Sequence, residues 1–480
     1  MSASPAAPTV DQTPCPVCGS PLLTDARRCG RCLAEIVPGR AAPAVPATSA
    51  ARRVARPAFF DAIRQRLTRR RVVLLLMLAV IAWQAVPRVL PKHAIPEPAG
   101  ARSADGGAQA WGYTHGNASA SRTTPAGAAG LTGAAAWSTP VAPLSAAAVA
   151  DAHAIYLPLA DGRLVALSRD DGHVLWTRAN EYTLTAAPTS AEGRLYVLQR
   201  GGSLQALDAA DGKVTWETEP LGAYGVAPVV VDGSVYLFFG LDNDGQETGL
   251  VAQVDAESGR VLWRGPASRA FPGIEMAVGS RSMAVIGGRT LEIYDRRYGE
   301  RTFWFTFRYG PDAVAITGDV AYVVTAGETA AISLTASRPW WDAVRGLWVN
   351  LYVNGLAPEP SPVPFIWLIR HGVHEAFAPV IEESTVIVAD RSGTIRAHDR
   401  ASGAVRWSTG GAGISAAPVL TARGLLVARG GELSLLNPQS GSLIAKRTTG
   451  AEDDPIVQVI PTDAGVFSFT AAGVITHSAP

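Results

Sequence analysis

The chain has no cysteine after Cys32, although it continues to residue 480. No intrachain disulfide can therefore form in the long downstream part. A stretch of more than about 350 residues is long enough to be held together by burial and hydrogen bonding alone. We expect the downstream part to build a large apolar core.

The chain also lacks a strong net charge. Its 42 basic and 41 acidic residues leave a formal charge of +1. Long-range attraction to nucleic acid needs a clear basic surplus. Three arginines near the cysteines, Arg27, Arg28 and Arg31, are typical of a solvated face. Nucleic acid is therefore not expected among the partners.

The four cysteines form two Cys-x-x-Cys pairs, which are separated by ten residues. This spacing brings four thiolates together around one tetrahedral Zn²⁺ ion. We predict a zinc ribbon over residues 12–36, with structural zinc as its cofactor; the alternative is two disulfides, which a cytoplasmic location disfavours. The predicted ligands are Cys15, Cys18, Cys29 and Cys32.

A hydrophobic run follows a linker that is rich in proline, alanine and arginine over residues 37–71. Residues 72–90 are apolar over almost the length that spans a bilayer, and Trp83 lies where an interface is expected. The alternatives are a signal-peptide core, which would begin unusually deep in the chain, and a buried helix with no neighbour to pack against. We predict one transmembrane helix.

The basic residues around this run predict its orientation. Residues 52–71 hold eight arginines and one aspartate, whereas the far flank has only Arg88, Lys92 and Arg102. Because basic flanks stay inside, the N-terminus is expected in the cytoplasm, with the rest outside the plasma membrane. Residues 91–125 are small and polar, which predicts a flexible spacer.

From residue 126 the chain repeats itself with a period of about 40 residues. Each unit has an apolar strand, a polar turn that ends in glycine, and a strand that carries tryptophan four residues later. Glycine supplies the positive φ of the turn, and the tryptophan has a fixed register for docking on the next unit. The predicted blade-docking residues are Trp137, Trp176, Trp216, Trp263 and Trp407.

Repeats of this length and pattern predict the four-stranded blades of a β-propeller. The positions equivalent to the tryptophan are 137, 176, 216, 263, 303, 367, 407 and 445, which predicts eight blades over 126–480. No inner strands precede Trp137, and the last three strands have no outer partner. These two incomplete pieces should complete one blade and close the ring. The fold class is therefore all-β, with the ribbon and the membrane helix as additions.

The repeats resemble those of the pyrroloquinoline-quinone dehydrogenase superfamily, whose docking motif is Ala-x-Asp-x-x-Thr-Gly-x-x-x-Trp. Ala206, Asp208, Gly212 and Trp216 match it, as do Ala397, Asp399, Gly403 and Trp407. Within the superfamily, the chain is most similar in style to the non-catalytic lipoprotein of the outer-membrane β-barrel assembly machinery. It departs from that protein in having a cysteine-rich N-terminus and no lipoprotein cysteine.

The resemblance implies a quinone cofactor only for the superfamily's enzymes. Those enzymes hold the quinone with contacts such as a vicinal disulfide, and hold Ca²⁺ with carboxylates and amides. The propeller repeats have no cysteine, and no calcium cluster or nucleophile motif can be assigned in them. Pyrroloquinoline quinone is therefore not expected, and neither is catalysis.

One insertion interrupts the repeat, over residues 338–364. In it Trp341, Val344, Trp348 and Leu351 recur on one helical face. The face either packs over the propeller rim or stays exposed for a partner or a membrane interface. The candidate partner-binding residues are Trp340, Trp341, Trp348 and Tyr352.

Three functions compete at this stage. The favoured hypothesis is a membrane-anchored, non-catalytic scaffold that binds proteins of the cell envelope and helps in their assembly. The alternatives are a quinoprotein oxidoreductase and an extracytoplasmic sensor. A single span with loose linkers offers no rigid relay, so the sensor ranks below the scaffold.

Overall fold

The structure is a computed structural model. This structure describes residues 94–96, 111–125, 135–243, 246–267, 275–307, 310–335, 355–356, 365–371, 376–449 and 453–479, together with the two short strands β1 and β2. The chain divides into two compact units, Met1–Pro91 and Lys92–Pro480. All described regular elements are β-strands.

In the N-terminal unit, β1 (Gln12–Pro14) pairs with β2 (Pro21–Leu23) as an antiparallel hairpin. Pro14 pairs with Pro21, so the two strands stand on either side of the first Cys-x-x-Cys pair in the sequence. The four predicted zinc ligands and the predicted membrane helix over residues 72–90 lie outside the described residues. Among the residues that are described, no helix is long and apolar enough to cross a membrane.

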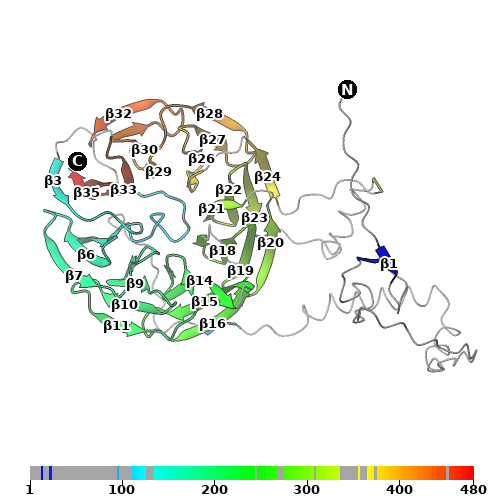
Figure 1. The fold of residues 1–480 in the computed structure, drawn as a ribbon. Helices are drawn as coiled ribbons and strands as arrows, with labels where there is room; N and C mark the ends of the chain where they lie inside the picture. Colours follow the sequence, from blue (N-terminus) through cyan, green and yellow to red (C-terminus); the bar gives the residue numbers. More distant parts are fainter. Residues whose placement is uncertain are drawn as a thin grey trace, which may run out of the picture. The chain divides into compact units, whose positions relative to one another are not determined.

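The larger unit is an eight-bladed β-propeller, as the repeat predicts (Figure 1). Each blade is an antiparallel sheet, and its strands are ordered from the innermost, next to the axis, to the outermost, at the rim. Blade 1 holds β4 (Val149–Ala150), β5 (Ala154–Pro158), β6 (Arg163–Ser168) and β7 (Val174–Ala179). Blade 2 holds β8 (Thr189–Ala191), β9 (Arg194–Leu198), β10 (Leu204–Asp208) and β11 (Val214–Glu217).

The next three blades follow the same order. Blade 3 holds β12 (Tyr224–Gly225), β13 (Val229–Val231), β14 (Ser234–Asn243), β15 (Gln246–Asp255) and β16 (Val261–Ala267). Blade 4 holds β17 (Glu275–Val278), β18 (Ser282–Gly287), β19 (Thr290–Asp295) and β20 (Arg301–Thr306). Blade 5 holds β21 (Pro311–Thr317), β22 (Val320–Thr325), β23 (Glu328–Ser333) and β24 (Phe365–Arg370).

The last three blades complete the ring. Blade 6 holds β25 (Val380–Ile381), β26 (Thr385–Ala389), β27 (Ile395–Asp399) and β28 (Val405–Thr409). Blade 7 holds β29 (Ala416–Thr421), β30 (Gly424–Arg429), β31 (Glu432–Leu436) and β32 (Leu443–Thr448). Blade 8 holds β33 (Ile456–Thr462), β34 (Gly465–Thr470), β35 (Val474–Ser478) and, outermost, β3 (Ala135–Pro140).

Blade 8 closes the ring by joining the two ends of the propeller. Strand β3 pairs with β35, from Ala135 opposite Ser478 to Pro140 opposite Val474. The predicted sharing of one blade by Trp137 and the C-terminal strands is thus confirmed. Among the described strands, β35 is therefore not left with an open edge, which removes a site for unwanted pairing.

Burial falls from the axis to the rim. Strands such as β5 and β26 are buried at every residue, whereas the outer strands β3 and β32 alternate exposed and half-buried residues. The core therefore lies between neighbouring blades and is made by the middle strands. This is the expected pattern for sheets that pack face to face.

The outer strands dock on the next blade through a tryptophan and a glycine. The turn glycines have φ near +70°. Each glycine lies against the indole on the outer strand of the preceding blade. The pairs are Trp137 with Gly172, Trp176 with Gly212, Trp216 with Gly259, Trp263 with Gly299, Trp367 with Gly403, and Trp407 with Gly441. Only glycine leaves room there, since a Cβ atom would lie within 3.0 Å of a neighbouring side chain in every pair.

Two junctions lack this pair. At the junction of blades 4 and 5, Phe303 holds the docking position, and the turn of blade 5 is replaced by the insertion between β23 and β24. At the junction of blades 7 and 8, Ala445 holds the position, and blade 8 has no turn before β3. The insertion's Trp340, Trp341, Trp348 and Tyr352 lie outside the described residues.

A candidate binding site on the propeller axis

Residues 111–125, here called the strap, cross the centre of the ring (Figure 1). The sequence predicts a flexible spacer over 91–125, whereas the structure places residues 111–125 inside the ring, bonded to its blades. Trp111 is 1% exposed and Arg122 is 6% exposed. The small polar residues that suggest a linker instead let the strap pack closely into the narrow space between inner strands. The upstream residue Ile95 also touches the propeller, where its N–H donates to the carbonyl of Arg297 in blade 4.

The strap is hydrogen-bonded to seven consecutive blades. Trp111 exchanges both backbone hydrogen bonds with Ala150 of blade 1, and the Tyr113 hydroxyl donates to the carbonyl of Val230 in blade 3. Five other strap carbonyls accept N–H groups at or near the ends of the innermost strands. The donors are Ser190 of blade 2, Val278 of blade 4, Ile316 of blade 5, Ile381 of blade 6 and Leu420 of blade 7.

A tight turn shapes the middle of the strap. The Asn117 Oδ1 atom accepts hydrogen bonds from the Ser119 hydroxyl and the Ser121 N–H. This side-chain oxygen takes the role that a backbone carbonyl has in an ordinary turn. Ala120 and Arg122 adopt positive φ angles of 56° and 53°, which cost side-chain-bearing residues about 1–3 kcal/mol each. The surrounding blades therefore hold the strap in a conformation that it would not adopt alone.

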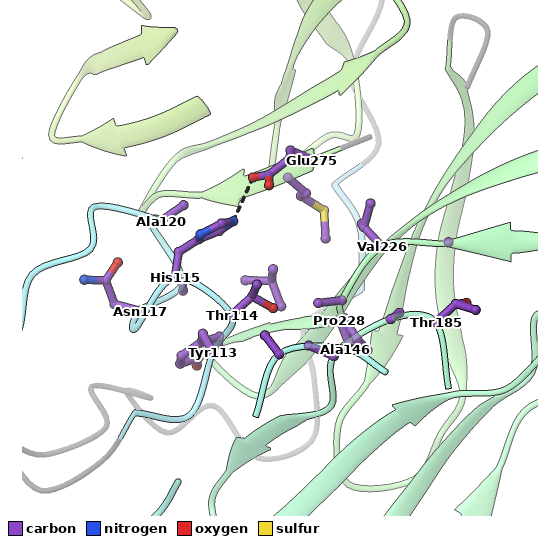
Figure 2. A pocket seen from close by; sticks show the side chains of 18 residues that line it. Tyr113, Thr114, His115, Asn117, Ala120, Ala146, Thr185, Val226, Pro228 and Glu275 are labelled. Carbon is purple, nitrogen blue, oxygen red and sulfur yellow. Dashed lines mark hydrogen bonds and ion pairs between the residues drawn. The ribbon is translucent and has the colours of Figure 1, made fainter. Parts of the chain in front are cut away.

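Three cavities border the strap. Cavity A, of about 380 Å³, is lined by strap residues and by residues that begin the innermost strands of blades 1–4, Pro228 and Glu275 among them (Figure 2). Cavity B, of about 740 Å³, is lined by strap residues and by residues at the ends of the innermost strands of blades 2–6, such as Ser190 and Val278. Cavity C, of about 290 Å³, lies between the strap and blades 1, 7 and 8. The strap thus separates cavity A from cavity B.

Three side chains on the strap and blade 4 form a polar chain. The His115 Nε2 atom lies 2.8 Å from the Glu275 carboxylate, as Figure 2 shows, and its Nδ1 atom lies 3.0 Å from the Arg122 guanidinium. Because arginine can only donate, His115 Nδ1 accepts, and its Nε2–H donates to Glu275. Burial lowers the pKa of Arg122 to about 10, and the charge of Glu275 acts in the opposite direction.

The axial cavities do not fit a quinone with calcium. Pyrroloquinoline quinone carries three carboxylates, yet Arg122 is the only arginine or lysine among the described residues that line the three cavities. Glu275 would repel a trianion. Within the described ranges, no three His, Cys, Asp or Glu side chains gather as metal ligands. The side chains that face the axis therefore do not form a cradle for this cofactor.

The sequence-predicted residues and this site are different sets. The docking tryptophans lie at the outer strands, and the zinc cysteines and insertion aromatics lie outside the described residues. Trp111, His115 and Arg122 were missed. A cluster of Trp, Tyr and His within a stretch of small residues, at 111–115, is the signal that could have indicated a buried segment.

Solved structures with the same fold include BamB, a designed protein and an alcohol dehydrogenase. BamB from Moraxella catarrhalis is 17% identical with a TM-score of 0.50, and the match covers 72% of this chain and 96% of that one. The designed protein Ika8 is 13% identical with a TM-score of 0.55, covering 73% and 98%. Quinohemoprotein alcohol dehydrogenase from Comamonas testosteroni is 13% identical with a TM-score of 0.56, covering 77% and 80%. At such identities the likeness shows the fold alone.

Sequence comparison is more specific about the family. No curated protein matches the chain. Residues 100–343 and 365–458 match the family described as outer membrane protein assembly factor BamB. The match includes the strap and most of the ring, and it leaves out most of the insertion. Because it extends over more than half of the sequence, the chain belongs to the outer membrane protein assembly factor BamB family.

Proposed function

We propose that this protein is a non-catalytic β-propeller scaffold that binds envelope proteins and supports their assembly. The observation that carries the proposal is the strap, which crosses the axis and is hydrogen-bonded to seven blades. A ring locked in this way offers partners a rigid surface on its rim and faces. Membership of a family described as an assembly factor supports the same function.

Exposed apolar side chains on the outer strands also support a binding role. On β24, Phe365 directly follows the insertion and is half-buried against Phe305, with ring centroids 4.8 Å apart. The next residue, Ile366, is 46% exposed. Exposed apolar clusters beside aromatic residues are typical of protein interfaces. We propose that the insertion's Trp340, Trp341, Trp348 and Tyr352 extend this surface, which we call the blade 5 rim.

The proposal includes an anchor and an inner domain. The apolar run over residues 72–90 would cross the plasma membrane once, with the N-terminus inside and the propeller outside. Cys15, Cys18, Cys29 and Cys32 would bind a structural zinc ion. The hairpin of β1 and β2 around the first cysteine pair suits such a ribbon.

A quinoprotein oxidoreductase is the alternative. The solved dehydrogenases share the fold, and their names concern alcohol and methanol oxidation. The favoured function remains the scaffold, because the residues of the axial cavities do not fit the quinone and calcium together.

Site-specific crosslinking tests the scaffold. A photoreactive residue is placed at Ile366 in the full chain, and a matched one at Ile444, which is 52% exposed and has the same register on β32. In intact cells, we expect Ile366 to crosslink to an envelope assembly protein, identified by mass spectrometry, and Ile444 to give far less product. Equal yields at both positions would contradict the blade 5 rim as the binding surface.

A further inference from the structure

Arg122 is a buried cation whose hydrogen bonds are incomplete. Its Nε–H donates to the carbonyl of Pro418 at 2.9 Å, its Nη2 to that of Ala417 at 3.2 Å, and its Nη1 to His115. A guanidinium has five N–H donors, so two remain without a partner among the described residues. The ring of Trp111, 5.9 Å away, adds only a cation–π contact.

Two buried hydroxyls near Arg122 also lack partners. The Oγ1 atom of Thr114 and the Oγ atom of Ser145 are shielded from solvent and have no hydrogen bond within the described part of the chain. Both residues line cavity C together with Arg122. Buried polar groups without partners are costly, so three such groups on one cavity need an explanation.

We propose that cavity C binds a carboxylate group, held by the free N–H donors of Arg122 and by the hydroxyls of Thr114 and Ser145, which would turn toward the cavity by rotation about χ1. A carboxylate has two oxygens that accept hydrogen bonds, and guanidinium groups bind it in a geometry that fits both. The volume of about 290 Å³ suits one small acid or one chain terminus. The site is independent of the scaffold surface on the blade 5 rim.

The charge balance of the axis favours a monoanion over a phosphate dianion. The one acidic residue that affects Arg122, Glu275, is separated from it by the His115 ring. One carboxylate would neutralise the buried cation locally. A second negative charge would meet Glu275 across the strap without a further cation among the described residues that line the cavities.

The test uses the full chain in detergent with propionate as the probe. Propionamide and sodium chloride at matched ionic strength serve as controls for shape and salt. N-acetyl-trialanine with a free or an amidated C-terminus distinguishes a peptide terminus from a small acid. Calorimetric titration and the melting temperature are measured for the wild type and for Thr114→Val/Ser145→Ala. Because these hydroxyls have no partner, the double variant should fold at least as well as the wild type.

We expect saturable binding of propionate, or of the free peptide but not its amide, and a loss of about tenfold or more in affinity in the double variant. Binding of propionate identifies a small acid, and binding of the peptide alone identifies a chain terminus. The proposal is overturned if neither probe binds, or if the folded double variant binds as tightly as the wild type. Equal effects of propionate and chloride would overturn it as well.

Discussion

The indole of Trp137 lies against Gly172, where a Cβ atom would stand 2.6 Å from the ring. Its Nε1–H donates to the carbonyl of Arg169 at 3.1 Å, in the same turn. Trp137 belongs to the closing strand β3, and Gly172 belongs to blade 1. This one contact therefore packs the closing blade against the first one.

Gly172→Ala should destabilise the propeller through both backbone and packing. Its φ of 74° costs alanine about 1–3 kcal/mol, and displacement of the indole adds about 1–3 kcal/mol. Gly193→Ala is the matched control, since its φ is 75° and no atom lies within 4 Å of the added Cβ. Urea unfolding should show a larger loss for Gly172→Ala. Equal losses would mean that packing on Trp137 contributes nothing.

Trp111→Ala should show that the strap is part of the folded ring. Removing a fully buried tryptophan costs about 3–5 kcal/mol. Trp304→Ala removes a tryptophan that is 54% exposed and should change the free energy of unfolding by less than about 1 kcal/mol. Denaturant titrations of the two variants make the comparison. If Trp111→Ala is as mild as its control, residues near 111 act only as a spacer.

The stability of the propeller should fall in mild acid. Burial lowers the pKa of His398 and His477 below 6.5, against the opposing effect of the Gly403 and Ala464 carbonyls. The unfolded chain then binds more protons than the folded one as the pH drops below about 6.5, so stability is lost there. His398→Leu should show a shallower loss between pH ~7.5 and ~5. An unchanged slope in chemical denaturation would exclude His398 as a cause.

The N-terminal segment should bind one zinc ion per chain. Cys15→Ser and Cys29→Ser each remove one thiolate and should abolish stoichiometric zinc, because a short ribbon has little core without its metal. Elemental analysis of the purified full chain measures the content. The melting temperature of the propeller should not change on chelation. Retention of zinc by both variants would exclude the four-cysteine site.

Trp341→Ser/Trp348→Ser should weaken partner binding and leave the ring stable. If the aromatic face serves a partner, crosslinking from Ile366 should fall several-fold while the melting temperature stays nearly constant. Ile444→Ser on blade 7 is the control and should change neither quantity. A loss of several kcal/mol in the double variant, as for two buried aromatics, would instead make the insertion a structural cover.

The ring was predictable because its signals are local and repeated. Each turn glycine stands four residues before its tryptophan, and glycine is the residue that the positive φ and the facing indole both require. The strap was not predictable in the same way. Its bonds to the blades are mostly backbone bonds, which any residue can make, and its small polar residues are equally typical of a linker. Trp111 and Arg122 acquire their roles only when distant blades surround them.

The strap also decides how the propeller would bear a mechanical load. In the chain, the contact of Ile95 with Arg297 comes first, the strap follows, and β3 comes last. Tension applied from the N-terminal side therefore reaches that single backbone contact, and then Ala150 and the ends of six further inner strands. Strand β3, whose pairing with β35 holds the ring closed, lies behind them along the chain. A tether pulled from that end would have to strip the strap from blade after blade before it could peel the closing strand.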